Sequence, residues 1–95
     1  MKKFRAVTES GTTYESNGFL IKINSPRDGY YSIRPGAMRV VSEDEIKGFS
    51  RAEELHIYVL DLPQAEVPEV GKRFYVAGRD GWRLSTWIET VEVYE

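Results

Sequence analysis

The chain has no cysteine, only four prolines and no long apolar run. Without cysteine there is no disulfide, no thiolate nucleophile and no cysteine-based zinc site. No apolar stretch approaches the roughly 18 residues of a membrane span, and the N-terminal residues lack the apolar core of a signal peptide. We therefore expect no membrane partner, and the lack of cysteine fits a reducing cytoplasm.

Histidine is scarce as well, since His56 is the only one in the chain. A hydroxyl nucleophile at Ser85 or Thr86 would depend on His56 alone as its base. A zinc site would need carboxylates around the same residue. The acids at 43–45 lack the spacing and the glycine of a calcium loop. The sequence thus predicts no enzyme, no bound metal and no cofactor.

Length and charge indicate one domain spanning residues 1–95. The net charge is −2, but residues 42–70 contain eight acids and only two bases, while the remainder is basic. Aromatic residues make up 13% of the chain and strengthen a core that is thin at this length. A thin core favours association, so we expect a homodimer or a higher homo-oligomer.

Turn signals divide the chain into short strands. Asn17-Gly18 and Asp80-Gly81 are typical of type I′ hairpin turns, with positive φ at both central positions. Alternating apolar residues and these turns predict strands at 4–9, 12–16, 19–24, 30–34, 56–60, 73–79 and from 82 onward. Six or seven such strands predict a mainly β fold, either a small antiparallel barrel (SH3-like or OB-like) or a strongly curved sheet.

Two local features interrupt this pattern. The apolar residues of the last strand change parity between Ile88 and Val91, which predicts a β-bulge at 88–90. Ser42 followed by Glu45 has the spacing of a capping box, and Ser50 with Glu53 repeats it. We expect an acidic insertion of one or two helical turns at about 42–54, broken at Gly48.

A first candidate site lies around the last hairpin. In a regular strand Arg83, Ser85 and Trp87 share one face, which would place a cation, a hydroxyl and a stacking ring together. This combination suits a phosphorylated ligand or a nucleic-acid strand. In the alternative, Trp87 is a core residue covered by the alkyl part of Arg83. The predicted ligand-binding residues are Arg79, Trp82, Arg83, Ser85 and Trp87.

A second candidate site surrounds the Asp28-Gly29 turn. Arg27, Tyr30, Tyr31 and Arg34 are residue types that anchor protein interfaces. An ordinary exposed turn with half-buried tyrosines explains the same residues. Nucleic-acid binding is less favoured, because the sequence pI is about 5.5 and no run of lysine and arginine exists.

The two ends of the chain show a resemblance. The opening FRAVTESGTTYESNGF and the closing VGKRFYVAGRDGWRLSTWIETVE resemble a group of small mycobacteriophage accessory proteins of unknown function. These proteins pair a start containing SGTTYE with an ending like GxRxYVxGxDxWxxSTxV. This chain departs from that ending at Trp87, where the resemblance leads us to expect proline.

The resemblance implies a phage-encoded protein in the cytoplasm of an infected host, and it supplies no catalytic residues. With the missing catalytic constellations, it predicts a non-enzymatic accessory protein that binds a host target, inhibiting or sequestering it, as in counter-defence. The partner is then a host protein or a nucleotide-like small molecule. Two alternatives stay open: a protein that sequesters a nucleotide signal through its arginine and tryptophan residues, and a small β-barrel that binds nucleic acid.

Overall fold

The computed structural model describes residues 1–65, 67–78 and 80–94. The β-strands are β1 (Lys3–Thr8), β2 (Thr13–Ser16), β3 (Ile21–Ser25), β4 (Gly29–Ile33), β5 (Met38–Val41), β6 (Arg73–Gly78) and β7 (Gly81–Tyr94). A short 3-10 turn, η1 (Pro35–Ala37), precedes β5, and the helices α1 (Glu43–Lys47) and α2 (Ala52–Asp61) follow it. This arrangement confirms the mainly β fold.

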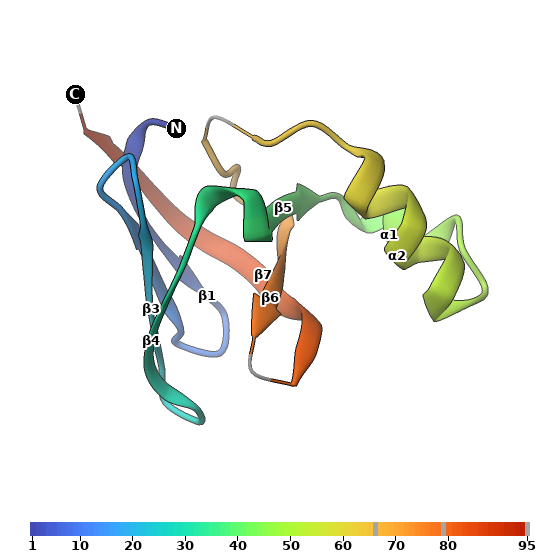
Figure 1. The fold of residues 1–95 in the computed structure, drawn as a ribbon, viewed down its shortest axis with the longest axis horizontal. Coiled ribbons are helices and arrows are strands. Elements are labelled where there is room, and N and C mark those ends of the chain that lie inside the picture. The colour runs from blue at the N-terminus through green and yellow to red at the C-terminus, as the bar shows by residue number, and fades with distance from the viewer. Residues whose placement is uncertain (66, 79, 95) are drawn as a thin grey trace.

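All seven strands form one antiparallel sheet in the order β4-β3-β2-β1-β7-β6-β5. The sheet curls into a half-barrel, with the long β7 crossing between its two halves (Figure 1). Because β4 and β5 lie at opposite ends of the sheet, the half-barrel stays open between them. Of the two predicted forms, the strongly curved sheet is therefore the one observed.

Hairpins form at the predicted turns, but with a different backbone geometry. Gly18 and Gly81 have φ of +97° and +102°, which a glycine adopts without steric cost. In the described part of the chain only glycines have positive φ, so φ is negative at Asn17 and Asp80. A type I′ turn needs positive φ at both central residues, and neither turn is therefore of this type. Asn17 instead accepts hydrogen bonds at its Oδ1 from the backbone N–H groups of Phe19 and Leu20, at 2.8 Å each.

The predicted bulge in the last strand is confirmed. Val7 pairs with Thr90 whereas Thr8 pairs with Ile88, so Glu89 is the extra residue on β7. A second irregularity occurs where β7 pairs with β6, because Arg73 faces Trp87 while Tyr75 faces Leu84. Each bulge bends β7 and increases its twist, which lets one strand serve both halves of the curled sheet.

The core is divided between the two faces of β6. Phe74 and Val76 point into the half-barrel and join the main core, which contains Phe4, Ala6, Tyr14, Ile21, Ile23, Ile33, Met38 and Ile88. Tyr75 points to the other face, where it packs with Val41 and Val59 beneath α2. Three consecutive residues of β6 are buried as a result, because the strand is covered on both faces.

The prediction of a strand at 56–60 is wrong, because these residues belong to helix α2. Leu55, Tyr58, Val59 and Leu62 all pack against the second core, and they recur with the 3.6-residue period of a helix. Ile57 and Val59 suggested the alternation of a strand, but only Val59 is buried, whereas Ile57 is exposed. The helix carries apolar residues on its exposed side as well, and these produced the apparent alternation. The helical insertion therefore extends beyond residue 54, to Asp61.

The capping predictions have different outcomes at the two helices. Ser42 caps α1 with a complete capping box: its Oγ accepts from Glu45 N at 3.1 Å, and Glu45 Oε1 accepts from Ser42 N at 3.0 Å. The expected break at Gly48 is also present, since α1 ends there. At α2, by contrast, the N-cap is Arg51 rather than Ser50, and no side chain caps the helix.

Candidate functional site

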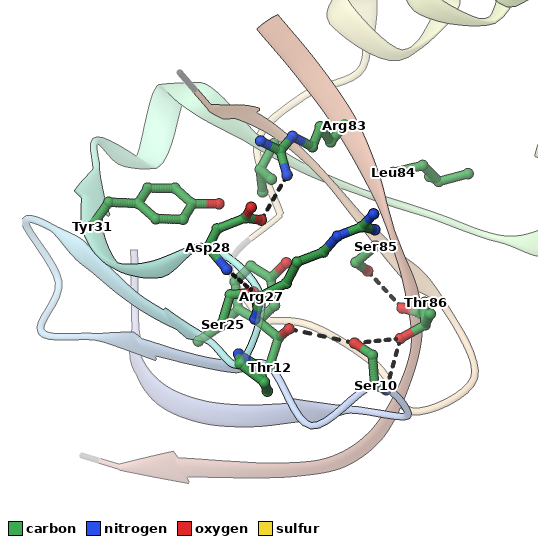
Figure 2. Close-up of a pocket in the computed structure, with 13 residues that line it drawn as sticks. Ser10, Thr12, Ser25, Arg27, Asp28, Tyr31, Arg83, Leu84, Ser85 and Thr86 are labelled. Carbon is green, nitrogen blue, oxygen red and sulfur yellow. Dashed lines mark hydrogen bonds and ion pairs between the residues drawn. The ribbon is translucent and has the colours of Figure 1, made fainter. Parts of the chain in front are cut away.

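A polar cleft of about 260 Å³ lies at one end of the half-barrel (Figure 2). Three segments that are distant in sequence meet there: the β1–β2 turn, the β3–β4 turn and the first half of β7. Its lining residues are Ser10, Thr12, Tyr14, Ser25, Pro26, Arg27, Asp28, Tyr31, Val76, Arg83, Leu84, Ser85 and Thr86. The wall is rich in hydroxyl groups and contains two arginines and one carboxylate.

The β3–β4 turn presents Arg27 and Asp28 to the cleft. Ser25 Oγ accepts hydrogen bonds from the backbone N–H groups of both residues, at 3.2 Å each. This side-chain turn fixes the backbone next to them, and Gly29, with φ of +78°, returns the chain into β4. The rigid turn leaves both charged side chains directed toward the cleft (Figure 2).

A cluster of hydroxyl groups links the β1–β2 turn to β7. Ser10 Oγ lies 3.4 Å from Thr12 Oγ1, and Thr86 Oγ1 lies 3.2 Å from Ser10 Oγ. Thr86 Oγ1 also accepts a hydrogen bond of 3.0 Å from Ser10 N. Hydroxyl groups both donate and accept, so this wall matches either a phosphate or a sugar hydroxyl.

Arg83 connects β7 to the β3–β4 turn across the cleft. Its Nη1 lies 2.6 Å from Asp28 Oδ2, and its Nη2 lies 3.2 Å from Asp80 Oδ2. The hydrogen bond to Asp28 raises the pKa of Arg83 above its ordinary value, so the guanidinium stays charged. Both partners keep about a third or more of their side-chain surface exposed, at 41% for Arg83 and 34% for Asp28. A ligand can therefore reach this ion pair.

Arg27 is differently placed. It is exposed, and it forms no ion pair with any acid in residues 1–65, 67–78 or 80–94. Figure 2 shows its side chain extending over the cleft in the direction of Ser85. A cation without a protein counter-charge is available to an anionic ligand at lower cost than one already paired.

Two tyrosines complete the wall. Burial raises the pKa of Tyr14, and it also raises the pKa of the half-buried Tyr31. Both phenols are therefore neutral at physiological pH and serve as hydrogen-bond donors or acceptors. Figure 2 shows the Tyr31 hydroxyl pointing toward Asp28 and Arg83, with the ring forming one side of the opening.

The structure separates the five predicted ligand-binding residues. Arg83 and Ser85 line the cleft. Trp82 lies instead on the face covered by α2, stacked on Tyr75 with ring centroids 5.4 Å apart. Trp87 lies beside Arg73, whose guanidinium carbon is 5.7 Å from its ring centroid. Arg79 lies outside the described residues.

The prediction that Trp87 shares a face with Arg83 and Ser85 is wrong, and the second bulge of β7 is the reason. Three residues of β6, from Arg73 to Tyr75, face four residues of β7, from Leu84 to Trp87. The extra residue reverses the alternation, so Trp87 projects to the face of Leu84. Trp87 is also 45% exposed, so it is no core residue either.

The predicted protein-interface residues are also divided. Arg27 and Tyr31 line the cleft, together with two of the five predicted ligand-binding residues. Tyr30 points away from it with 79% of its surface exposed, and Arg34 is exposed at the end of β4. Successive residues of a strand point to opposite faces, which explains why neighbouring tyrosines take different positions.

Sequence reasoning missed Asp28 as the partner of Arg83, 55 residues away, and missed the hydroxyl wall. One signal was available, because the two segments that carry the resemblance meet at this cleft. SGTTYE supplies Ser10, Thr12 and Tyr14, and the closing segment supplies Arg83, Ser85 and Thr86. Their convergence follows from the pairing of β1 with β7, which no local pattern encodes.

The cleft offers few residues for catalysis or metal binding. His56 does not line the cleft; its Nδ1 lies 2.6 Å from Tyr75 Oη on the face covered by α2. Within residues 1–65, 67–78 and 80–94, no three His, Cys, Asp or Glu side chains gather as metal ligands. No helix in that part of the chain is long and apolar enough to cross a membrane.

Comparisons with protein-family models, with curated proteins and with solved structures find no match to this chain.

Proposed function

We propose that this is a non-enzymatic accessory protein that sequesters a small phosphorylated, nucleotide-like ligand in the polar cleft. One observation carries the proposal: Arg27 and Arg83 line the same cleft, together with several serine and threonine hydroxyls. Guanidinium groups bind phosphate through charge-assisted hydrogen bonds, and hydroxyls supply further donors.

Arg27 is the principal phosphate ligand in this proposal. Its charge has no acidic partner among the described residues, and its side chain extends over the cleft (Figure 2). Ser10, Thr12 and Thr86 form a connected hydroxyl cluster on the wall. A phosphate between Arg27 and this cluster would gain hydrogen bonds without breaking an ion pair.

The remaining groups suit the rest of a nucleotide. The ring of Tyr31 at the opening provides a surface on which a base can stack. The Asp28 carboxylate accepts hydrogen bonds from a sugar hydroxyl or from an amino group of a base. Because Arg83 holds Asp28 at 2.6 Å, the carboxylate is already oriented before the ligand arrives.

The volume of the cleft limits the size of the ligand. Pockets for drug-sized ligands range from about 300 to 1,000 Å³, so a cleft of about 260 Å³ accepts a mononucleotide or a smaller phosphorylated compound. The net charge of −2 also disfavours binding of a nucleic-acid double helix.

The phage origin of the protein and its place in the infected host cytoplasm belong to the same proposal. They are supported by the resemblance of the two chain ends to mycobacteriophage accessory proteins. In that setting a non-catalytic protein that binds a nucleotide-like compound withdraws it from the host, which is a direct way to counter a nucleotide-based defence.

Isothermal titration calorimetry with AMP, adenosine and inorganic phosphate tests this function. We expect AMP to bind and adenosine to bind at least about tenfold more weakly, because it lacks the charged group. Arg27→Ala and Arg83→Ala should each weaken AMP binding by about tenfold or more. Arg34→Ala is the matched control, since Arg34 is also an exposed arginine but follows the other end of β4, outside the cleft.

Three results would contradict the proposal. The first is no binding of AMP or phosphate. The second is an equal loss for Arg27→Ala and Arg34→Ala, which would indicate general electrostatic attraction. The third is tighter binding of a single-stranded oligonucleotide than of AMP, with affinity that falls steeply with salt, which would indicate a nucleic-acid-binding protein.

A further inference from the structure

An aromatic shelf lies on the face of the sheet opposite the cleft, between α2 and the β6–β7 hairpin. We define this shelf as His56, Ile57, Tyr75 and Trp82. Tyr75 and Trp82 stack with ring centroids 5.4 Å apart, and His56 contacts both rings, at 5.7 and 5.9 Å. The hydrogen bond between His56 and Tyr75 fixes the helix to the strand at this point.

The shelf is open to solvent although it is apolar. Ile57 is 63% exposed and projects from α2 beside the rings. The open groove above these residues has a volume of about 440 Å³. Tyr75 itself is buried against Val41 and Val59, so the shelf rests on a packed core and keeps its shape. A pre-formed aromatic surface of this kind is typical of an anchor site for a partner.

The helical insertion that carries one side of the shelf is mainly negative. Residues 42–61 contain six acids and two bases. Glu53 lines the groove itself, one helical turn before Ile57 on α2. Glu53, Glu54 and Asp61 form no ion pair with any base in the described residues. The carboxylates next to the groove are thus available to a basic partner.

We propose that the aromatic shelf docks a basic, amphipathic segment of a partner protein. An apolar side chain of that segment would lie between Ile57 and Trp82. A lysine or arginine beside it would pair with Glu53, or lie over the indole of Trp82. The charge of the helical insertion selects this partner class, because an acidic segment or a nucleic acid would be repelled. The site is separate from the cleft and does not depend on the proposed ligand.

Tryptophan fluorescence reports on this site directly. The chain has two tryptophans, so Trp87→Phe leaves Trp82 as the only tryptophan to report fluorescence. The probe is a short amphipathic peptide of leucine and lysine, and its control is the same peptide with every lysine replaced by glutamate. We expect a saturable shift of the Trp82 emission with the basic peptide only, weakening as salt screens the pairing with Glu53.

Variants in the Trp87→Phe background separate the shelf from general attraction. Ile57→Ser and Glu53→Lys should each weaken binding of the basic peptide by about tenfold. The first removes an apolar contact and the second reverses a charge. Val70→Ser is the matched control, because Val70 is also 63% exposed but lies outside the shelf. Since Ile57 and Glu53 are exposed, circular dichroism should show an unchanged fold.

The proposal is overturned if the basic peptide produces no shift, or if the glutamate peptide binds equally well. Equal weakening by Val70→Ser would likewise show that the shelf is not the site. A shift that depends on protein concentration alone would mean that a second copy of this chain covers the shelf. None of these outcomes affects the phosphate-binding test, which uses the opposite face.

Discussion

Phe74 joins two other aromatic rings in the main core. It is fully buried on β6 and stacks between Tyr14 and Phe4, with ring centroids 4.0 and 6.4 Å away. Phe74→Ala should lower the free energy of unfolding by about 3–5 kcal/mol, because the cavity cannot close between two rings. Phe19→Ala is the matched control: Phe19 is 84% exposed, and we expect a change within about 0.5 kcal/mol. Urea denaturation measures both, and similar losses would contradict this packing.

Glu45 makes the stability of the protein depend on pH in the acidic range. Tyr58 Oη donates to Glu45 Oε2 at 2.6 Å, and this hydrogen bond, followed by that from Ser42 N, lowers the pKa of Glu45. A lowered folded-state pKa gives stability that is complete above the unfolded value, about 4.3, and is lost as the pH falls through the folded value. Tyr58→Phe should therefore reduce the loss of stability on acidification.

Denaturation at neutral and at acidic pH measures this effect. Tyr30→Phe provides the control, because the exposed Tyr30 hydroxyl has no hydrogen-bond partner in the described part of the protein. If both variants show the same pH dependence, the Tyr58 hydroxyl does not lower the pKa of Glu45.

At the scale of elements, α1 and α2 differ in how they begin. Ser42 caps α1, whereas Arg51 stands at the N-cap of α2 with no side-chain hydrogen bond, next to the positive end of the helix dipole. Arg51→Ser should create a capping box with Glu54 and stabilise the protein by about 0.5–2 kcal/mol. Ser42→Ala should destabilise it by a comparable amount. Thermal unfolding measures both, and a loss of stability for Arg51→Ser would contradict this description of α2.

The strands were easier to predict than this helical insertion, for a physical reason. A hairpin is encoded by a turn glycine at positive φ and by the alternation of apolar and polar residues in the flanking strands. The strands β1 to β4, β6 and β7 can therefore be predicted from a few consecutive residues each. Residues 56–60 are apolar on several sides, which fits a strand and a helix equally well. Packing of Leu55, Val59 and Leu62 on the sheet decides in favour of the helix.

At the scale of the whole molecule, the two edges of the sheet are unequal. The β5 edge is tied to the segments on either side of it in the chain, since Arg39 donates to Leu62 O at 3.0 Å and to Gly36 O at 2.8 Å. The β4 edge has Tyr30 at 79% exposure. We expect self-association through β4, because an uncovered edge strand pairs readily with another strand.

Sedimentation velocity checks this expectation. The protein should be a dimer at micromolar concentration, and Tyr30→Lys should shift it toward monomer, because lysine at an edge opposes strand pairing. Phe19→Lys, which changes an exposed aromatic at the β2–β3 turn, should leave the dimer intact. A monomeric wild-type protein would refute the expectation.

The candidate site was only partly predictable. Arg83 and Ser85 were identified from the strand pattern, and Arg27 and Tyr31 from residue type, but as members of two separate sites. The curl of the sheet brings them together through the ion pair of Arg83 with Asp28. Trp87 was misplaced because a bulge reverses all alternation beyond it, and the second bulge of β7 had no signal in the sequence.

The hairpins, the bulge at Glu89, the capping box of α1 and the mainly β class could all be inferred from the sequence alone. These features depend on φ preferences, on the alternation of apolar residues along a strand and on hydrogen bonds between near neighbours. The three-dimensional structure was needed to establish that β1 pairs with β7, that the sheet stays open, and that 52–61 is a helix. It alone formed the cleft and the aromatic shelf, because both are lined by residues that only long-range strand pairing and burial bring together.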